Sequence, residues 1–300
     1  KIISSLTHDT ICQIYDLGIH RAPGMQSGGL PYYAMDYVDG FTLDELLTTE
    51  GPLSVGATVE LFLKIAEGLS YAHRRGVVHK DLKPGNIMIE QRKDADVQVR
   101  ILDFGISELN EPGSRRGSRG EVTIVGSAAY MSPEQFRGRV LEKVSDLYSL
   151  GCSMYETLTG NLPYEGDGFD ALEKAHTTKL CPRLYDKTGC QFPDEIEAIV
   201  AKCMRKNPQE RYQSASELTL DLQRLIEGKP LQFAQSGESE AKKRAKATGG
   251  QSQNVGAAEA RRQKQFEFPI AAVSLVFVLL IVGACGYFVW QFNPQHEPDK

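Results

Sequence analysis

Between residues 77 and 90, the stretch VVHKDLKPGNIMIE sets several polar side chains between two apolar runs. Asp81, Lys83 and Asn86 follow one another at spacings of two and three residues, and a second carboxylate, Asp103, comes seventeen residues after Asn86. Asp103 ends an apolar run that has the character of a buried strand. Carboxylates and an amide in short loops beside buried strands would carry a desolvation cost if no ligand used them. We therefore expect these residues to share one site.

Phosphoryl transfer uses this set of groups. A hard divalent cation needs oxygen ligands, which Asn86 and Asp103 can provide. The charge on the transferred group needs a cation, which Lys83 can supply, and the attacking hydroxyl needs an acceptor that orients it, which Asp81 can be. One such tetrapeptide alone is weak evidence, whereas the ordered set is strong.

The elements that must position these residues can be read from the pattern. Two β-type runs, at residues 10–20 and 30–38, flank a glycine-rich turn at 27–29. A short helix is expected at 42–47, and a long amphipathic helix begins near Ser54 and ends at Gly76. Three more helices are predicted at the residues 143–160, 194–206 and 214–228, with Asp194 and Ser214 as N-caps of the last two.

Charge and cysteine content narrow the function classes. Residues 1–228 carry 25 basic and 33 acidic residues, a net charge of −8, whereas residues 229–264 carry eight basic and three acidic ones, a net charge of +5. An acidic body argues against nucleic-acid binding, because such binders usually carry the positive charge themselves. The six cysteines form no CxxC pair, which favours reduced thiols in a cytosolic domain.

The polar constellation resembles the protein kinase family, and in detail the bacterial eukaryotic-type Ser/Thr receptor kinases, over residues 1–228. The family pattern H-x-D-x-K-x-x-N is matched at residues 79–86, and Asp-Phe-Gly is matched at 103–105. The stretch GSAAYMSPEQ resembles the end of an activation segment, with Ser-Pro-Glu at 132–134 in place of the usual Ala-Pro-Glu. The implied fold class is α+β, a protein-kinase-like fold with a complete, mainly helical C-lobe, an incomplete N-lobe and a single transmembrane helix.

The resemblance also implies roles for individual residues. Met35 would be the gatekeeper, the backbone of Asp36 and Val38 would meet adenine, and Met88 and Leu102 would form the pocket floor, although the two methionines and Leu102 could instead be plain core residues. The implied sets are: catalytic, Asp81, Lys83 and Asn86; metal, Asn86 and Asp103; activation segment, Phe104, Gly105, Ser114, Ser118, Thr123, Ser127 and Glu134; structural support, His79, Lys80, Asp146 and Arg211.

Within the supporting set, Asp146 would brace the catalytic loop and Arg211 would pair with Glu134. His79 is expected to be a hydrogen-bonded scaffold residue rather than a proton shuttle. The implied cofactors are ATP and Mg²⁺ or Mn²⁺. Because Lys83 replaces the arginine pattern of tyrosine kinases, the implied substrates are protein Ser/Thr hydroxyls.

Two departures from the family pattern stand out. Lys80 precedes Asp81 where the family usually has arginine, so its grip on a phosphorylated activation segment should be weaker and less directional. Phosphorylation at Ser114, Ser118 or Thr123 would order that segment; the alternative is a mobile loop that needs no switch.

The second departure is an absence. The family needs a glycine-rich loop, a strand lysine and a helix glutamate, and the sequence contains no match to them. The chain looks like a piece cut from a longer protein, with three N-lobe strands and most of a helix lacking. We expect these 300 residues to bind ATP weakly and to phosphorylate poorly. Two other hypotheses stay open: a pseudokinase-like scaffold without catalysis, and a small-molecule phosphotransferase.

The C-terminal part predicts a membrane anchor. Residues 270–290 contain no charge, and about 20 apolar residues suffice for a helix to cross a bilayer; the alternative is a buried core helix. Arg261, Arg262 and Lys264 place the body in the cytoplasm and the C-terminus outside, in a single-pass protein of the cell membrane. The basic linker would also attract anionic lipid. A homodimer is left open, and no nucleic-acid partner is expected.

These inferences give the following division of the chain: partial N-lobe and hinge at 1–40, C-lobe at 41–228, disordered basic juxtamembrane linker at 229–268, transmembrane helix at 269–291 and extracytoplasmic stub at 292–300.

Overall fold

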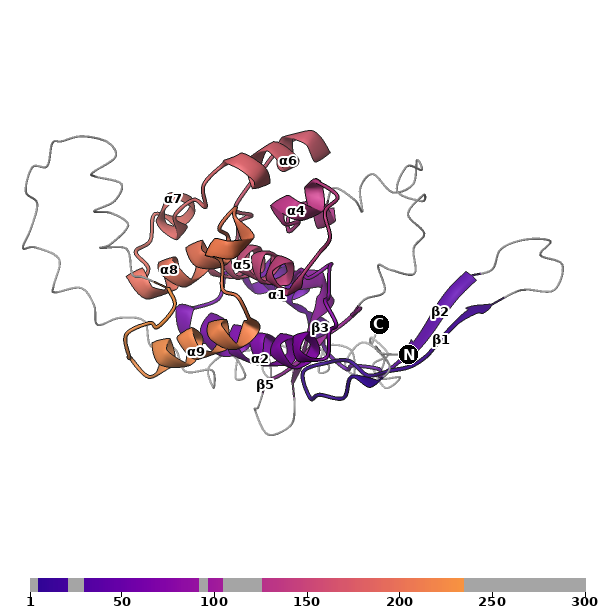
Figure 1. Cartoon of the computed structure of the whole chain (residues 1–300). Helices are drawn as coiled ribbons and strands as arrows, with labels where there is room; N and C mark the ends of the chain where they lie inside the picture. The colour runs from indigo at the N-terminus through magenta and orange to yellow at the C-terminus, as the bar shows by residue number, and fades with distance from the viewer. Residues whose placement is uncertain (1–4, 21–29, 92–96, 105–125, 235–300) are drawn as a thin grey trace, which may run out of the picture. The chain divides into compact units, whose positions relative to one another are not determined.

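A hairpin opens the described part of the chain. The computed structural model describes residues 5–20, 30–91, 97–104 and 126–234. Strand β1 (Ile14–His20) pairs antiparallel with β2 (Leu30–Met35), with Leu17 opposite Tyr33. Both expected β-type runs are therefore confirmed, and the expected turn between them lies outside the described residues. Figure 1 shows the two strands side by side.

A second, three-stranded sheet supports the catalytic segments. It has the order β3 (Phe41–Thr42), β4 (Ile87–Gln91) and β5 (Val97–Ile101), all antiparallel. Ile87 is paired with Ile101, so the two side chains lie on the same face of the sheet, and both are fully buried. This sheet fixes the chain just after Asn86 and just before Asp103.

Two helices precede the catalytic loop. Helix α1 (Leu43–Glu50) is capped by the side chain of Thr42, and α2 (Val55–Arg74) is capped by that of Ser54. Gly76 follows α2 with φ +75°, a left-handed conformation that favours glycine after a helix. The predicted start and end of this long helix are thus confirmed.

The rest of the body is helical. Nearly every residue of α5 (Lys143–Thr159) is buried, as expected for a central helix. The other elements are η2 (Pro84–Asn86), α4 (Pro133–Phe136), α6 (Phe169–Thr178), α7 (Leu184–Thr188), α8 (Asp194–Cys203), η4 (Pro208–Glu210) and α9 (Ala215–Ile226). Ser214 caps α9 as predicted. The prediction for α8 is wrong by one residue: Pro193 occupies the N-cap position and Asp194 is the first helical residue.

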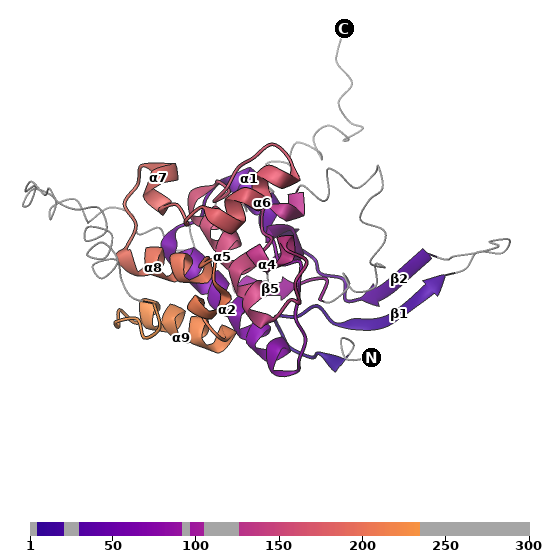
Figure 2. The same ribbon diagram turned by 45° about the horizontal axis from the view of Figure 1, so that its top comes forward.

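The core lies between these helices. Helix α2 packs along α9 and against α5, while α5 also contacts α7 and α8. Figures 1 and 2 both show α2 beside α9. Phe62, Ile65 and Leu69 of α2 are fully buried in this cluster. Apolar residues three and four positions apart share one face of a helix, which is why this side of α2 faces inward.

The end of the body differs from the expected boundary. Asp221 of α9 is fully buried, and its carboxylate accepts hydrogen bonds from the backbone N–H groups of Gln232, Phe233 and Ala234, at 2.6–3.2 Å. A buried carboxylate requires such donors. The ordered body therefore extends to Ala234, and the expected linker cannot begin at residue 229. Within the described part of the chain, no helix has the length and apolarity to span a membrane; residues 270–290 lie outside that part.

Candidate active site

The catalytic loop brings Asp81, Lys83 and Asn86 together. The Nζ of Lys83 lies 3.1 Å from Oδ2 of Asp81. Asn86 donates its Nδ2 hydrogens to the backbone oxygen of Asp81 at 2.7 Å and to Asp81 Oδ2 at 3.3 Å. Leu82 and Pro84 are buried between them, so the apolar residues anchor the loop while the polar ones converge. The three residues predicted as catalytic thus form one cluster.

Asp103 is tied to this cluster through the backbone. The N–H of Leu102 donates to the backbone oxygen of Asn86 at 2.9 Å. Asp103 itself has φ +59°, in the left-handed region that non-glycine residues rarely adopt. Its Oδ1 accepts a hydrogen bond from the hydroxyl of Tyr33 on β2 at 2.9 Å. Burial, together with the hydrogen bond to Asp103, raises the pKa of Tyr33 to about 12.

The donor set fits a divalent cation. Because Nδ2 of Asn86 is committed to Asp81, the atom left to ligate a cation is the amide oxygen. With an Asp103 carboxylate oxygen, it gives two hard ligands, and Mg²⁺ usually completes its sphere with phosphate oxygens and water. Among the residues that the structure describes, no three His, Cys, Asp or Glu side chains are grouped for a metal. The predicted site has one carboxylate and one amide as protein ligands, so it differs from a site built of three such side chains.

The carboxylate of Asp146 fixes the catalytic loop through hydrogen bonds. Its Oδ2 accepts from the backbone N–H of His79 and lies 2.7 Å from Nε2 of His73, and its Oδ1 accepts from the N–H of Lys80. Lys80 has φ +74°, a conformation that costs on the order of 1–2 kcal/mol in a non-glycine residue. Burial alone would raise the pKa of Asp146, but the hydrogen bonds from His73 and His79 lower it overall.

His79 has both ring nitrogens engaged. Its side chain is fully buried, with Nε2 2.7 Å from the oxygen of Leu102 and Nδ1 accepting from the N–H of Asp81 at 3.3 Å. The ring also meets Phe104 edge to face, at 4.7 Å between centroids. His79 therefore links the two segments that carry Asp81 and Asp103, as a scaffold residue would.

Glu134 and Arg211 form the expected pair. Arg211 donates two hydrogen bonds to the Glu134 carboxylate, at 2.7 and 2.9 Å, and Ser145 donates a third. Burial alone would raise the pKa of Glu134, but the bonds from Arg211 and Ser145 lower it overall. Next along the chain, Gln135 donates to the backbone oxygen of Lys80 at 2.8 Å. The segment at 132–136 is thereby fixed to both the catalytic loop and the C-terminal helices.

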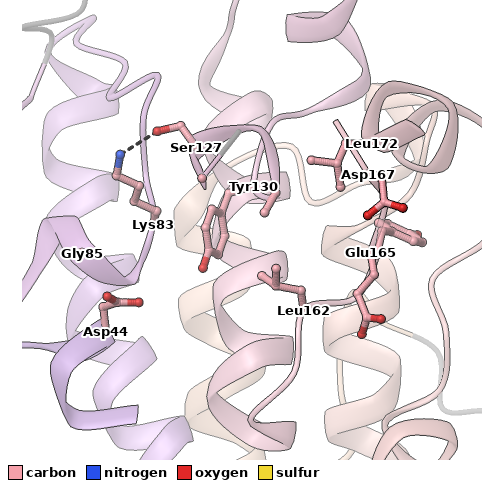
Figure 3. A pocket seen from close by; sticks show the side chains of 13 residues that line it. Asp44, Lys83, Gly85, Ser127, Tyr130, Leu162, Glu165, Asp167 and Leu172 are labelled. Atoms are coloured by element: carbon pink, nitrogen blue, oxygen red, sulfur yellow. Dashed lines mark hydrogen bonds between the residues drawn. The ribbon is translucent and has the colours of Figure 1, made fainter. Parts of the chain in front are cut away.

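A pocket opens beside Lys83. Lys83 donates from Nζ to the Oγ of Ser127 at 2.7 Å, and this contact forms one edge of a cavity of about 590 Å³ (Figure 3). Leu162 and Leu172 form apolar walls of the cavity, and Tyr130 and Asp44 also line it. Lys83, which lines the cavity, lies 3.1 Å from Asp81.

The residues expected around adenine lie on separate elements. Met35 ends β2 and is partly exposed, while Met88 on β4 and Leu102 after β5 are half-buried. The N–H of Asp36 donates to the backbone oxygen of Gln13. Val38 is half-buried in the segment after β2. Their part in adenine binding stays a prediction. Gly105, Ser114, Ser118 and Thr123 lie outside the described residues.

Three side-chain hydrogen bonds of the site are not predictable from the sequence. Tyr33 and Gln135 gave no signal, because a tyrosine in a strand and a glutamine after a glutamate are explained by local structure alone. The contact of His73 with Asp146 spans 73 residues and cannot be read from local spacing.

Comparison with known proteins agrees with this geometry. The family model described as "Protein kinase domain" matches residues 1–221. The serine/threonine-protein kinase PknB of Mycolicibacterium smegmatis is 37% identical over 226 residues, which cover 75% of this chain and 35% of that protein. PknB of Mycobacterium tuberculosis is 36% identical over 228 residues, covering 76% and 35%. The chain thus spans about a third of the length of these curated relatives.

Solved structures give the same fold. The Mycobacterium tuberculosis PknI kinase domain has a TM-score of 0.55 at 22% identity, covering 74% of this chain and 75% of that one. Rad53 residues 1–466 in complex with AMP-PNP has a TM-score of 0.55 at 26% identity, covering 73% and 51%. Together with the family match over most of the chain, the catalytic-loop cluster identifies this chain as a member of the protein kinase family.

Proposed function

We propose that the protein is a serine/threonine kinase that transfers the γ-phosphoryl group of ATP to protein hydroxyls. The observation that carries the proposal is the cluster of Asp81, Lys83 and Asn86, with Asp103 joined to it through Leu102. The names of the relatives, serine/threonine-protein kinases, support the substrate class. The complex of the similar kinase Rad53 with AMP-PNP supports a nucleotide as the donor.

Each group has a step in this reaction. Asp81 accepts the hydrogen bond of the substrate hydroxyl and orients its oxygen toward the phosphoryl group. Lys83, 3.1 Å from Asp81, stabilises negative charge on the transferred group. Asn86 and Asp103 would hold the divalent cation, which when bound neutralises charge on the phosphates. Because the groups are held before substrate arrives, little reorganisation is needed during the reaction.

The cavity next to Lys83 is where we place the protein substrate. One edge of it is Ser127, whose hydroxyl accepts from Lys83, so a bound segment would lie within reach of Asp81. The apolar walls at Leu162 and Leu172 would bury side chains that flank the phosphorylated residue. This arrangement suits a polypeptide better than a small phosphate acceptor.

The test is a single-turnover phosphorylation assay with ATP, Mg²⁺ and a basic Ser/Thr-rich protein, in which the full chain in detergent is in excess over the acceptor so that slow transfer is measurable. Asp81→Asn should lower the rate by about a hundredfold or more, because general-base contributions are about 10²–10⁴. Asp170→Asn, an exposed aspartate on α6, is the matched control and should keep the rate. An Asp81→Asn variant as fast as the wild type would refute the proposal.

We also propose that these 300 residues alone turn over slowly. The sequence contains no G-x-G-x-x-G stretch to cover the phosphates. A chain extended upstream by such a loop and a strand lysine should phosphorylate much faster than the 300 residues. If the extended chain bound ATP and Mg²⁺ but transferred nothing, a scaffold role would replace the enzymatic one.

A further inference from the structure

Three tyrosines of the hairpin each donate a hydrogen bond to an aspartate. Tyr15 donates to Asp36, and Tyr32 donates to Asp16 at 3.2 Å. These two contacts stay within the hairpin and the residue that follows it. Tyr33 instead reaches Asp103, 70 residues away along the chain, at 2.9 Å. Its hydroxyl thereby connects β2 to the proposed metal site.

Asp103 is fixed on its backbone side. Leu102 next to it donates its N–H to Asn86 and accepts a hydrogen bond from Nε2 of His79 at 2.7 Å. The backbone at Asp103 is in the left-handed region, which sets the direction in which its Cβ leaves the chain. The carboxylate can still rotate about its own side-chain bonds. The contact that the structure gives its Oδ1 is the hydroxyl of Tyr33.

We infer that Tyr33 is a positioning residue of the proposed metal site: its hydrogen bond to Oδ1 holds the Asp103 carboxylate in one orientation. The inference rests on the proposed function. Carboxylates that ligate metals are commonly oriented by a hydrogen-bonding neighbour, and loss of that neighbour typically costs about 10–100-fold in metal affinity or activity. A neutral phenol suits this task because it donates one hydrogen bond and leaves the negative charge on the carboxylate.

The chain offers a matched pair of variants. Tyr33→Phe removes one hydroxyl and keeps the ring, and Tyr32→Phe makes the same change at the adjacent position, where the hydroxyl reaches Asp16. Both side chains are partly exposed on β2, so neither change opens a cavity. A difference between the two variants therefore reports on Asp103 rather than on the hairpin.

The experiment titrates Mn²⁺ alone into the full chain in detergent and follows free Mn²⁺ by electron paramagnetic resonance. Tyr33→Phe should weaken Mn²⁺ binding about tenfold, while Tyr32→Phe stays within about twofold of the wild type. The thermal midpoints of both variants should match that of the wild type. Equal Mn²⁺ affinity in the wild type and Tyr33→Phe would overturn the inference, and tighter binding by Tyr33→Phe would also overturn it, because Tyr33 would then compete with the cation.

Asp103→Asn separates this inference from the proposed function. If the wild type binds Mn²⁺ and Asp103→Asn does not, the metal site stands, and the result for Tyr33→Phe decides the role of Tyr33 alone. If the wild type binds no more Mn²⁺ than Asp103→Asn does, both the metal site and the role of Tyr33 are overturned.

Discussion

At the scale of single residues, the conformation of the site is set by a buried hydrogen-bond acceptor, Asp146, rather than by the groups proposed to react. Asp146 is 1% exposed and never meets a substrate, yet three donors converge on it. Two of them are backbone N–H groups of His79 and Lys80, which immediately precede Asp81. The conformation of the catalytic loop is thus set by one carboxylate, because a buried backbone N–H must find an acceptor.

Replacing Asp146 with asparagine should destabilise the fold. The amide has one acceptor oxygen fewer and brings an NH₂ group toward existing donors, so at least one buried N–H loses its partner. We expect the free energy of unfolding to fall by about 3 kcal/mol, and phosphorylation to fall with it. Urea unfolding measured by circular dichroism tests the first part.

The control for this change is Asp170→Asn on the exposed face of α6, which should stay within about 0.5 kcal/mol of the wild type. An Asp146→Asn variant as stable as that control would contradict this account, because it would mean that a single amide oxygen serves the loop as well as the carboxylate does.

At the scale of elements, Arg211 is hydrogen-bonded to three other segments. Besides its two bonds to Glu134, it donates to the backbone oxygens of Arg205 at 2.7 Å, Val144 at 3.0 Å and Lys206 at 3.3 Å. The planar guanidinium supplies five N–H donors in a fixed arrangement, which an ammonium group cannot reproduce. The position of Glu134 relative to the C-terminal helices thus depends on one side chain.

Arg211→Lys should therefore be strongly destabilising although the charge is kept. We expect a loss of about 3–5 kcal/mol in the free energy of unfolding, because an ammonium has three donors where Arg211 makes five hydrogen bonds, so at least two of these buried bonds are lost. Arg137→Lys, at an exposed position just after α4, is the matched control. Similar unfolding midpoints in urea for the two variants would contradict this account.

Lys206 gives a prediction with a defined pH range. Its Nζ donates to the hydroxyls of Tyr148 and Tyr164, each at 2.9 Å, and burial lowers its pKa to about 8 from the ordinary 10.5. Between these values the unfolded chain keeps a proton that the folded chain has released. Because the unfolded state then binds more protons, this residue makes the fold more stable as pH rises from 8 to 10.5.

The measurement compares wild type with Lys206→Met across that range. The free energy of unfolding of the wild type relative to the variant should increase by about 2 kcal/mol between pH 7 and pH 10. Using the difference removes the titration of cysteines and tyrosines that both proteins share. The same series on Lys202→Met, from α8, corrects for the loss of a lysine. A difference that stays constant with pH would show that Lys206 is not buried as a perturbed amine.

The elements were predictable where local signals agree. Ser54 and Ser214 cap the helices they precede, and α2 has the buried apolar side that an amphipathic helix should have. The predictions failed where the structure of a segment depends on a contact with a residue far away in the sequence. Residues 229–234 have the composition of a linker, but the buried carboxylate of Asp221 accepts hydrogen bonds from the N–H groups of residues 232 to 234. The contact of Tyr33 with Asp103 likewise depends on how the hairpin meets β5, and no local spacing encodes that.

At the scale of the whole molecule, an acidic body is followed by a basic segment and an uncharged run. Residues 229–264 carry a net charge of +5, and residues 270–290 carry no charge. A positive segment before an apolar one is retained in the cytoplasm, which is the side where ATP is available to a kinase. The location that the sequence predicts is therefore consistent with the proposed activity, and each can be tested alone.

We expect the chain to stay in the membrane fraction after an alkaline wash, because residues 270–290 would cross the bilayer as a helix. Leu279 and Leu280 lie at the centre of this run, where an arginine costs about 2.5–3.5 kcal/mol per residue. The double variant Leu279→Arg, Leu280→Arg should appear in the soluble fraction, while alanine at both positions should keep the protein in the membrane. In sealed inside-out vesicles, added protease should digest the body, because the cytoplasmic face points outward. Protection of the body, or release of the wild type by the wash, would contradict the predicted span and its orientation.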